Sequence, residues 1–235
     1  MKKSQVMALL IALALLGVSC ARKDASESSN SDSKGASATS DRSSKSAQVK
    51  EAPASDHDFK YDLTKDGTGI EITGYTGNHD NLVIPKTIEG YPVKFVGRIS
   101  NGEYIPNSNP LYAGHTRNDT SKTQTVVIPE GVELIGYEAF YSMPSLRKVV
   151  LPNTVSIISD SAFYRCYSLS EINIPAGIKK IYGTAFRGCE NLYVLHIPES
   201  ITSIEFIDSD QFSGCQKLSI ATRQRLKDLG YKGTF

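Results

Sequence analysis

The sequence lacks the features that mark most enzymes and nucleic-acid-binding proteins. Its 26 basic and 25 acidic residues nearly cancel, so charge gives no reason to expect a nucleic acid or an acidic partner. No Gly-x-Ser-x-Gly elbow, phosphate-binding glycine loop, His-Glu-x-x-His or Cys-x-x-Cys occurs. The four histidines, His57, His79, His115 and His196, are scattered without the spacing of metal ligands. We therefore expect a protein that is not an enzyme and that has no metal and no cofactor; a hydrolase with an unrecognised site is the alternative.

A long apolar run is absent as well. Residues Val6 to Val18 are apolar or small, but these thirteen residues fall short of the ~20 that a helix needs to span a bilayer. Lys2 and Lys3 precede the run, and a positive start followed by a short apolar core is typical of an export signal. We predict that residues 1–20 form a signal peptide.

The end of this run, Gly17-Val18-Ser19-Cys20, resembles a bacterial lipobox. The usual leucine stands three residues before the cysteine, whereas Leu16 stands four before it, a looser form that spirochaetal lipoproteins share. The resemblance implies that Cys20 is acylated and anchors the protein to a bacterial membrane. Cleavage after Ala21 is the alternative, because Ser19-Cys20-Ala21 also fits a small-x-small site and would leave a soluble secreted protein.

Residues 21–56 contain few apolar side chains. Eleven of these 36 residues are serine, and no aromatic residue occurs before Phe59. Such a segment buries too little apolar surface to offset the entropy lost on ordering it. We predict a disordered tether, which as a flexible chain would reach roughly 30–35 Å root-mean-square. Its mixed charges could instead bind a partner. The folded domain is expected over residues 57–235.

From Lys122 onward the sequence repeats itself every 23 residues. The repeat is marked by prolines at Pro129, Pro152, Pro175 and Pro198. Val, Ile or Leu recurs three and one residues before each proline, and Val or Ile recurs three and six residues after it. An Ala-Phe pair and a Met or Cys three residues past the Phe follow in three copies: Ala139-Phe140 with Met143, Ala162-Phe163 with Cys166, and Ala185-Phe186 with Cys189. The fourth copy carries a three-residue insertion and continues as Phe212, Cys215 and Leu218. A period of this length indicates a solenoid.

The pattern within each repeat predicts its local structure. Apolar residues three and one before the proline alternate with other residues, as in a half-buried strand. The proline ends that strand because it has no N–H to donate. The Val/Ile pair predicts a second short extended segment, and Ala-Phe with the following Cys and Leu fits one or two helical turns. One coil of 23 residues buries too few side chains to fold alone, so the coils must stack.

The string Leu146-x-x-Val149-x-Leu151-Pro152-x-x-Val155-x-x-Ile158, followed by Ala162-Phe163-x-x-Cys166-x-x-Leu169, resembles the BspA-like leucine-rich repeat. Residues 72–93 resemble the first repeat of that family, and residues 218–235 resemble its end. The resemblance implies an α/β leucine-rich-repeat solenoid of 23-residue coils, with parallel strands and short helical turns. It also implies a surface lipoprotein of the kind found in spirochaetes and oral anaerobes.

Both ends of the repeat array have sequences suited to capping. Phe59, Tyr61 and Leu63 alternate with polar residues, a glycine-rich turn follows over residues 65–69, and Ile70 begins a second alternating segment. This pattern predicts a β-hairpin that covers the first coil. Residues Ile220 to Leu229 are predicted to form a helix that ends before Gly230 and covers the last coil.

Cys166, Cys189 and Cys215 occupy equivalent positions in successive coils. Neighbouring strands lie ~4.7–4.9 Å apart, which is within the Cα range of a disulfide, and export permits oxidation. However, three is an odd number, and Met143 fills the same position in the preceding coil. We therefore predict free buried thiols, with a disulfide as the alternative.

The outward side chains of the predicted strands are the candidate binding residues. Two rows run across the coils: Val83, Val127, Val150, Asn173 and His196 in the inner row, and Asn81, Thr125, Lys148, Glu171 and Val194 in the outer row. An exposed valine cluster suits a contact patch, although valine also favours strands generally. Tyr141 and Tyr164 share another position, where they either form an outward aromatic ladder or pack against neighbouring coils.

Residues 98–121 interrupt the repeat. The repeat predicts an Ala-Phe pair near residue 100, but none occurs there. The segment instead contains Tyr104, Tyr112, His115 and Arg117. Long irregular insertions are often functional, and this composition suits a contact loop. A degenerate coil without a role is the alternative.

Taken with the resemblance, these observations predict a protein-binding module anchored at the outer membrane or cell surface. The family implies adhesion to host extracellular matrix proteins, host cells or other bacteria. The alternative is an envelope scaffold in the periplasm that binds the cell's own proteins. Nucleic acid is not an expected partner.

Overall fold

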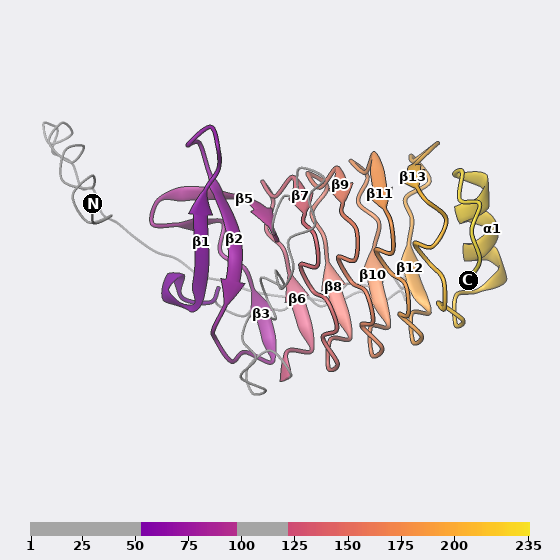
Figure 1. The fold of residues 1–235 in the computed structure, drawn as a ribbon, viewed down its shortest axis with the longest axis horizontal. Helices are drawn as coiled ribbons and strands as arrows, with labels where there is room; N and C mark the ends of the chain where they lie inside the picture. The colour runs from indigo at the N-terminus through magenta and orange to yellow at the C-terminus, as the bar shows by residue number, and fades with distance from the viewer. Residues whose placement is uncertain (1–52, 98–121) are drawn as a thin grey trace, which may run out of the picture. The chain divides into compact units, whose positions relative to one another are not determined.

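The computed structural model describes residues 53–97 and 122–235. In this part of the chain, coils of about 23 residues stack into a parallel β-solenoid (Figure 1). Each coil contributes one short strand to each of two sheets. The five-stranded sheet has the order β12 (Val194–His196), β10 (Glu171–Asn173), β8 (Lys148–Val150), β6 (Thr125–Val127) and β3 (Asn81–Val83).

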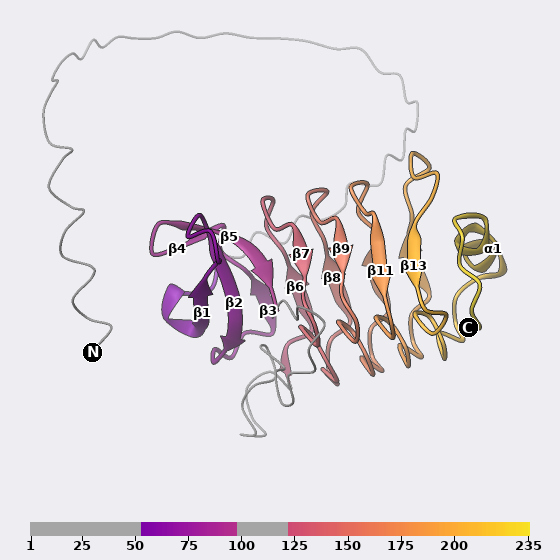
Figure 2. The ribbon, with the colours of Figure 1, turned by 45° about the horizontal axis from the view of Figure 1, so that its top comes forward.

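The second sheet has eight strands. Its order is β1 (Phe59–Leu63), β2 (Ile70–Tyr75), β5 (Tyr91–Val96), β7 (Leu134–Ile135), β9 (Ile157–Ile158), β11 (Lys180–Tyr182) and β13 (Glu205–Ile207), and β4 (Thr87–Ile88) pairs with β5. The pairing is parallel except in β1–β2 and β4–β5. Figure 2 shows the strands of this sheet side by side along the stack.

Residues 23 apart lie side by side across the coils. In the five-stranded sheet Val126 pairs with Val149, Val149 with Ile172, and Ile172 with Leu195, and all four side chains are buried. Each strand ends two residues before its proline, and the second strand of the coil follows the proline. The predicted solenoid of parallel strands is thereby confirmed.

A column of stacked phenylalanines lies in the core of the coils. The ring centroids of Phe140 and Phe163 are 5.1 Å apart, those of Phe163 and Phe186 5.2 Å, and those of Phe186 and Phe212 5.1 Å. Successive rings are within 9° of parallel, and all four are fully buried. Because the period places one ring in each coil, each ring contacts its neighbours along the solenoid axis rather than within its own coil.

The segment predicted as helical turns consists of separate hydrogen-bonded turns. The amide of Tyr141 donates to the carbonyl of Glu138, as expected for one turn, but the amide of Phe140 donates to Ala162 in the next coil at 2.8 Å. Phe163 donates in the same way to Ala185 at 2.7 Å. Alternate amides are therefore used to join coils, and a continuous helix cannot form there.

The predicted N-terminal hairpin is present as β1 and β2, which pair antiparallel. The short 3-10 helix η1 (Asp56–Asp58) precedes it, and the amide of Ala54 donates to Val83 at 3.0 Å, so this segment also covers the first strand of the five-stranded sheet. In the described residues, β1 is itself left as the terminal strand of the eight-stranded sheet. The hairpin thus moves the free edge outward rather than removing it.

The predicted C-terminal helix is α1 (Ile220–Asp228). The Ser219 side chain accepts a hydrogen bond from the amide of Thr222 at 3.0 Å and caps the helix. Leu226 and Leu229 are buried against the last coil, and Gly230 follows with φ 110°. Among residues 53–97 and 122–235, no helix has both the length and the apolar character needed to cross a bilayer.

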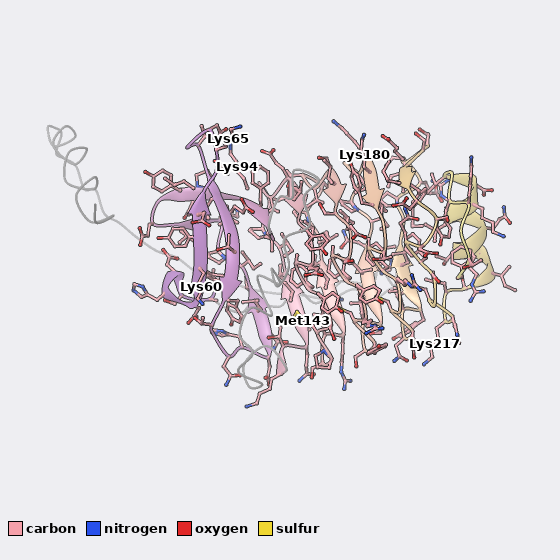
Figure 3. All side chains as sticks on the ribbon, in the orientation of Figure 1. Lys60, Lys65, Lys94, Met143, Lys180 and Lys217 are labelled. Atoms are coloured by element: carbon pink, nitrogen blue, oxygen red, sulfur yellow. The ribbon has the colours of Figure 1, made fainter. Side chains whose placement is uncertain are left out.

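The cysteines of successive coils are free and fully buried, as predicted. Each thiol donates to the carbonyl of the phenylalanine in the preceding coil: Cys166 to Phe140 at 2.9 Å, Cys189 to Phe163 at 3.2 Å and Cys215 to Phe186 at 3.2 Å. Met143 occupies the same place in the earlier coil and lies within the stack (Figure 3).

Candidate functional site

The two predicted rows of outward side chains are neighbours in the five-stranded sheet. In the outer row, Lys148 pairs with Glu171 and Glu171 with Val194; in the inner row, Val127 pairs with Val150 and Asn173 with His196. All of these side chains are at least partly exposed. Because the strands are parallel and in register, the rows form one continuous surface across the coils.

The outer row is polar except for Val194, and its two charged residues form an ion pair. Lys148 Nζ lies 2.7 Å from Glu171 Oε1, and Nε2 of His196, in the inner row, lies 3.7 Å from the same oxygen. The Thr125 hydroxyl donates to Asn81 Oδ1 at 2.7 Å one coil further back. Exposed ion pairs of this kind contribute about 0–1 kcal/mol to folding, so their charges remain available to a partner at small cost.

The inner row changes character along the sheet. Val127 and Val150 lie side by side, and Val150 is 39% exposed. Asn173 is used within the sheet: its Nδ2 donates to the Leu151 carbonyl and its Oδ1 accepts from the Leu151 amide, both at 2.8 Å. The Asn173 side-chain amide thus replaces backbone pairing between β8 and β10 at this position. The backbones of the two strands pair only at Glu171 and Ile172 of β10. Asn173 therefore has fewer hydrogen-bonding groups to offer a ligand than a fully exposed asparagine would have.

Aromatic side chains gather at the turns that follow the first two Ala-Phe pairs. The rings of Tyr141 and Tyr164 stack at 5.3 Å with 20° between their planes, and the Arg165 guanidinium lies 5.1 Å from the centre of the Tyr164 ring. Tyr167 follows in the same turn and is 42% exposed. Burial is the main cause that raises the pKa of Tyr141 above its ordinary value. The Arg165 charge lowers this pKa, whereas Tyr164 and Tyr167 raise it. We call Tyr141, Tyr164, Arg165 and Tyr167 the tyrosine cluster.

The tyrosine cluster combines both alternatives raised by the sequence. Tyr141 and Tyr164 pack against each other across the coils, yet both remain partly exposed. Sequence reasoning missed Arg165 and Tyr167. The repeat contains the signal that identifies them, because an inward Cys166 leaves its two chain neighbours pointing outward.

Residues 117–232 match a family model described as "BspA type Leucine rich repeat region", in six copies. These are BspA-type leucine-rich repeats. Repeats of this type form a protein-binding module, and such scaffolds are typically not enzymes. Comparison with curated proteins found no match.

Solved structures of other leucine-rich-repeat proteins are similar to this chain. A leucine-rich-repeat protein of T. pallidum is 29% identical, with 79% of this chain and 99% of that chain covered and a TM-score of 0.46. One from Bacteroides ovatus is 25% identical over 68% of this chain and 44% of that chain, with a TM-score of 0.48. A leucine-rich cell surface protein from Faecalibacterium prausnitzii is 25% identical over 72% and 54% of the two chains, with a TM-score of 0.43.

Three predicted site residues, Cys20, Tyr104 and Tyr112, lie outside the described residues. Over residues 53–97 and 122–235, no group of three or more His, Cys, Asp or Glu side chains is placed to hold a metal ion. His79 instead contacts the hydroxyl of Tyr75 through its Nδ1, at 2.5 Å. The features that the repeats present to a partner are the two strand rows and the tyrosine cluster.

Proposed function

We propose that this chain is an exported lipoprotein, acylated at Cys20, whose BspA-type repeats bind a protein on a host matrix, a host cell or another bacterium. Export and acylation are supported by the apolar run Val6 to Val18, which is followed by Ser19 and Cys20. A tether over residues 21–56 would hold the repeats away from the membrane.

The tyrosine cluster is the observation that carries the binding proposal. Tyrosine and arginine are enriched in the cores of protein interfaces and among the residues that contribute most to binding. The Tyr164 ring contacts both the Tyr141 ring and the Arg165 guanidinium, so less conformational entropy remains to be lost when a partner covers it. The strand rows supply a larger and more polar surface, in which Lys148 and Glu171 form an ion pair and His196 lies close to Glu171.

A binding experiment tests this proposal. The full chain is presented to a panel of immobilised extracellular matrix proteins, and dissociation constants are measured by biolayer interferometry. For a partner that binds, we expect the double change Tyr164→Ala and Arg165→Ala to weaken affinity at least ~10-fold, which corresponds to about 1.4 kcal/mol.

Tyr91→Ala is the control, because Tyr91 is an exposed tyrosine that lies in β5, away from the tyrosine cluster. Equal effects of the two changes would argue against the tyrosine cluster, and no binding across the panel would argue against adhesion. Protease treatment of intact cells adds a separate criterion, since a repeat domain shielded from protease fits the periplasmic scaffold instead.

A further inference from the structure

Among the residues that the structure describes, the first strand of the eight-stranded sheet has an open edge. Within the described part of the chain, strand β1 pairs only with β2. No backbone hydrogen bond joins the other side of β1 to another described strand. The five-stranded sheet, by contrast, has its first strand covered through Ala54. At the far end of the stack, α1 lies against the last coil (Figure 1). An unpaired strand edge is a template for another strand.

The sequence of β1 is complementary to itself when it is paired antiparallel. A pair centred on Tyr61 places Lys60 opposite Asp62 of the other copy, and Phe59 opposite Leu63. Lys60 and Asp62 are both exposed on one face of the strand, where Figure 3 shows Lys60 on β1. Opposite charges directly across an antiparallel pair attract, whereas like charges would repel.

The other face of β1 also favours a second copy. Leu63 is 53% exposed, although Phe59 at the start of the same strand is buried. The pairing of β1 with β2 is irregular between Lys60 and Tyr61, but the extra residue, Thr73, belongs to β2. Strand β1 therefore keeps the regular alternation that a second strand requires.

We propose that two copies of this chain associate through their β1 edges, antiparallel about a two-fold axis at Tyr61. The two eight-stranded sheets then form one continuous sheet, and each Leu63 is brought opposite the Phe59 position of its partner. Charged residues on an edge strand often prevent pairing, but a single strand that carries both signs two residues apart attracts its own copy. This association does not depend on the proposed adhesion. If both hold, the dimer presents two binding surfaces, which raises avidity.

Charge exchange between copies tests the proposal. Two differently tagged forms of the full chain are mixed in detergent, one is captured, and co-capture of the other is measured. Lys60→Asp gives a strand with two acidic residues and Asp62→Lys gives one with two basic residues. For two tagged copies of the same single variant, we expect co-capture to be at least ~5-fold lower than for two copies of the unchanged chain. Mixing the two single variants, or making both changes in one chain, should restore it.

Lys180→Glu is the matched control, because it changes an exposed strand lysine of the same sheet at β11 and should leave co-capture unchanged (Figure 3). Circular dichroism of each variant reports whether it is folded. Absence of co-capture by the unchanged chain would overturn the proposal and would indicate that another segment or protein covers the edge. Failure of the mixed single variants to recover would overturn it as well, because the antiparallel register about Tyr61 requires recovery.

Discussion

At the residue scale, the buried thiols show how position in the coil controls chemistry. Burial raises the pKa of Cys166 and Cys215 to about 12, and it raises the pKa of Cys189 well above its ordinary value of 9.0. Each thiol also donates to a phenylalanine carbonyl, which requires that it stay protonated. These cysteines therefore act as small apolar residues and not as nucleophiles.

This burial predicts a decline of stability at alkaline pH. In the unfolded chain the thiols lose their protons near pH 9, whereas in the folded chain they keep them to about pH 12. The unfolded state then binds fewer protons, so the free energy of unfolding falls as pH rises through this window, by up to about 1.4 kcal/mol per pH unit for each thiol. We expect the urea midpoint to be steady from pH 7 to about 8.5 and to drop between about 9 and 10.

A variant in which Cys166, Cys189 and Cys215 are all alanine provides the control. It should be less stable at every pH, but its midpoint should change less between pH 9 and 10. Tyr75 and Tyr231, whose pKa values burial also raises to about 12, begin from an ordinary value of 10.0 and so act mainly above that range. Parallel declines of the two proteins would show that the thiols are not the cause.

At the element scale, each turn between Phe and Cys passes through one residue with positive φ. The equivalent positions are Ser142 (φ 53°), Arg165 (φ 58°), Gly188 (φ 77°) and Gly214 (φ 82°). This conformation is strained for residues with a Cβ and free of strain for glycine. Two coils therefore carry strain in this turn that the next two avoid.

Exchanging residue types at this turn should give effects of opposite sign. A Cβ at Gly188 would meet its nearest neighbours at an ordinary 3.6 Å, so Gly188→Ala introduces backbone strain without a clash, and we expect a loss of about 1 kcal/mol. Ser142→Gly relieves the same strain and should be neutral or slightly stabilising. Urea unfolding of the two variants beside the unchanged chain measures both. A loss of stability for Ser142→Gly as large as that for Gly188→Ala would contradict this account.

The same turns show what sequence reasoning can and cannot reach. The 23-residue period identifies the apolar inward residues of a coil, because burial repeats with the coil; Phe163 and Cys166 are examples. It misses buried polar residues such as Gln211. It does not reveal that the amide of Phe163 donates to the next coil. For this reason the sequence predicts helical turns where the structure has separate hydrogen-bonded turns. The Asn173 bridge to Leu151 and the stacking of Tyr141 on Tyr164 depend on distances between coils, which a pattern along one chain does not contain.

The whole molecule is held together from coil to coil. In such a quasi-one-dimensional array each repeat contacts only its neighbours, and the terminal coils depend on caps. The phenylalanine column ends at Phe212, whose ring meets the edge of Tyr231 at 5.4 Å and 84°. The Tyr231 hydroxyl accepts from the Phe212 amide at 3.3 Å and donates to the carbonyls of Ser209 and Thr234. The C-terminal cap therefore completes the aromatic column as well as covering the last strands.

Removal of residues 220–235 should therefore destabilise the whole array. Leu226, Leu229 and Tyr231 are all buried. At about 2 kcal/mol for each side chain, their loss removes about 6 kcal/mol, which is comparable to the 5–15 kcal/mol that typically separates folded from unfolded domains. The shortened chain should lose its cooperative urea transition or shift it to much lower urea, and it should bind the dye ANS through the exposed end of the phenylalanine column. Lys232→Ala, at an exposed position of the same segment, should change neither. An unchanged transition after the deletion would mean that the last coil is stable without its cap, and that stability in this protein resides within each coil rather than between coils.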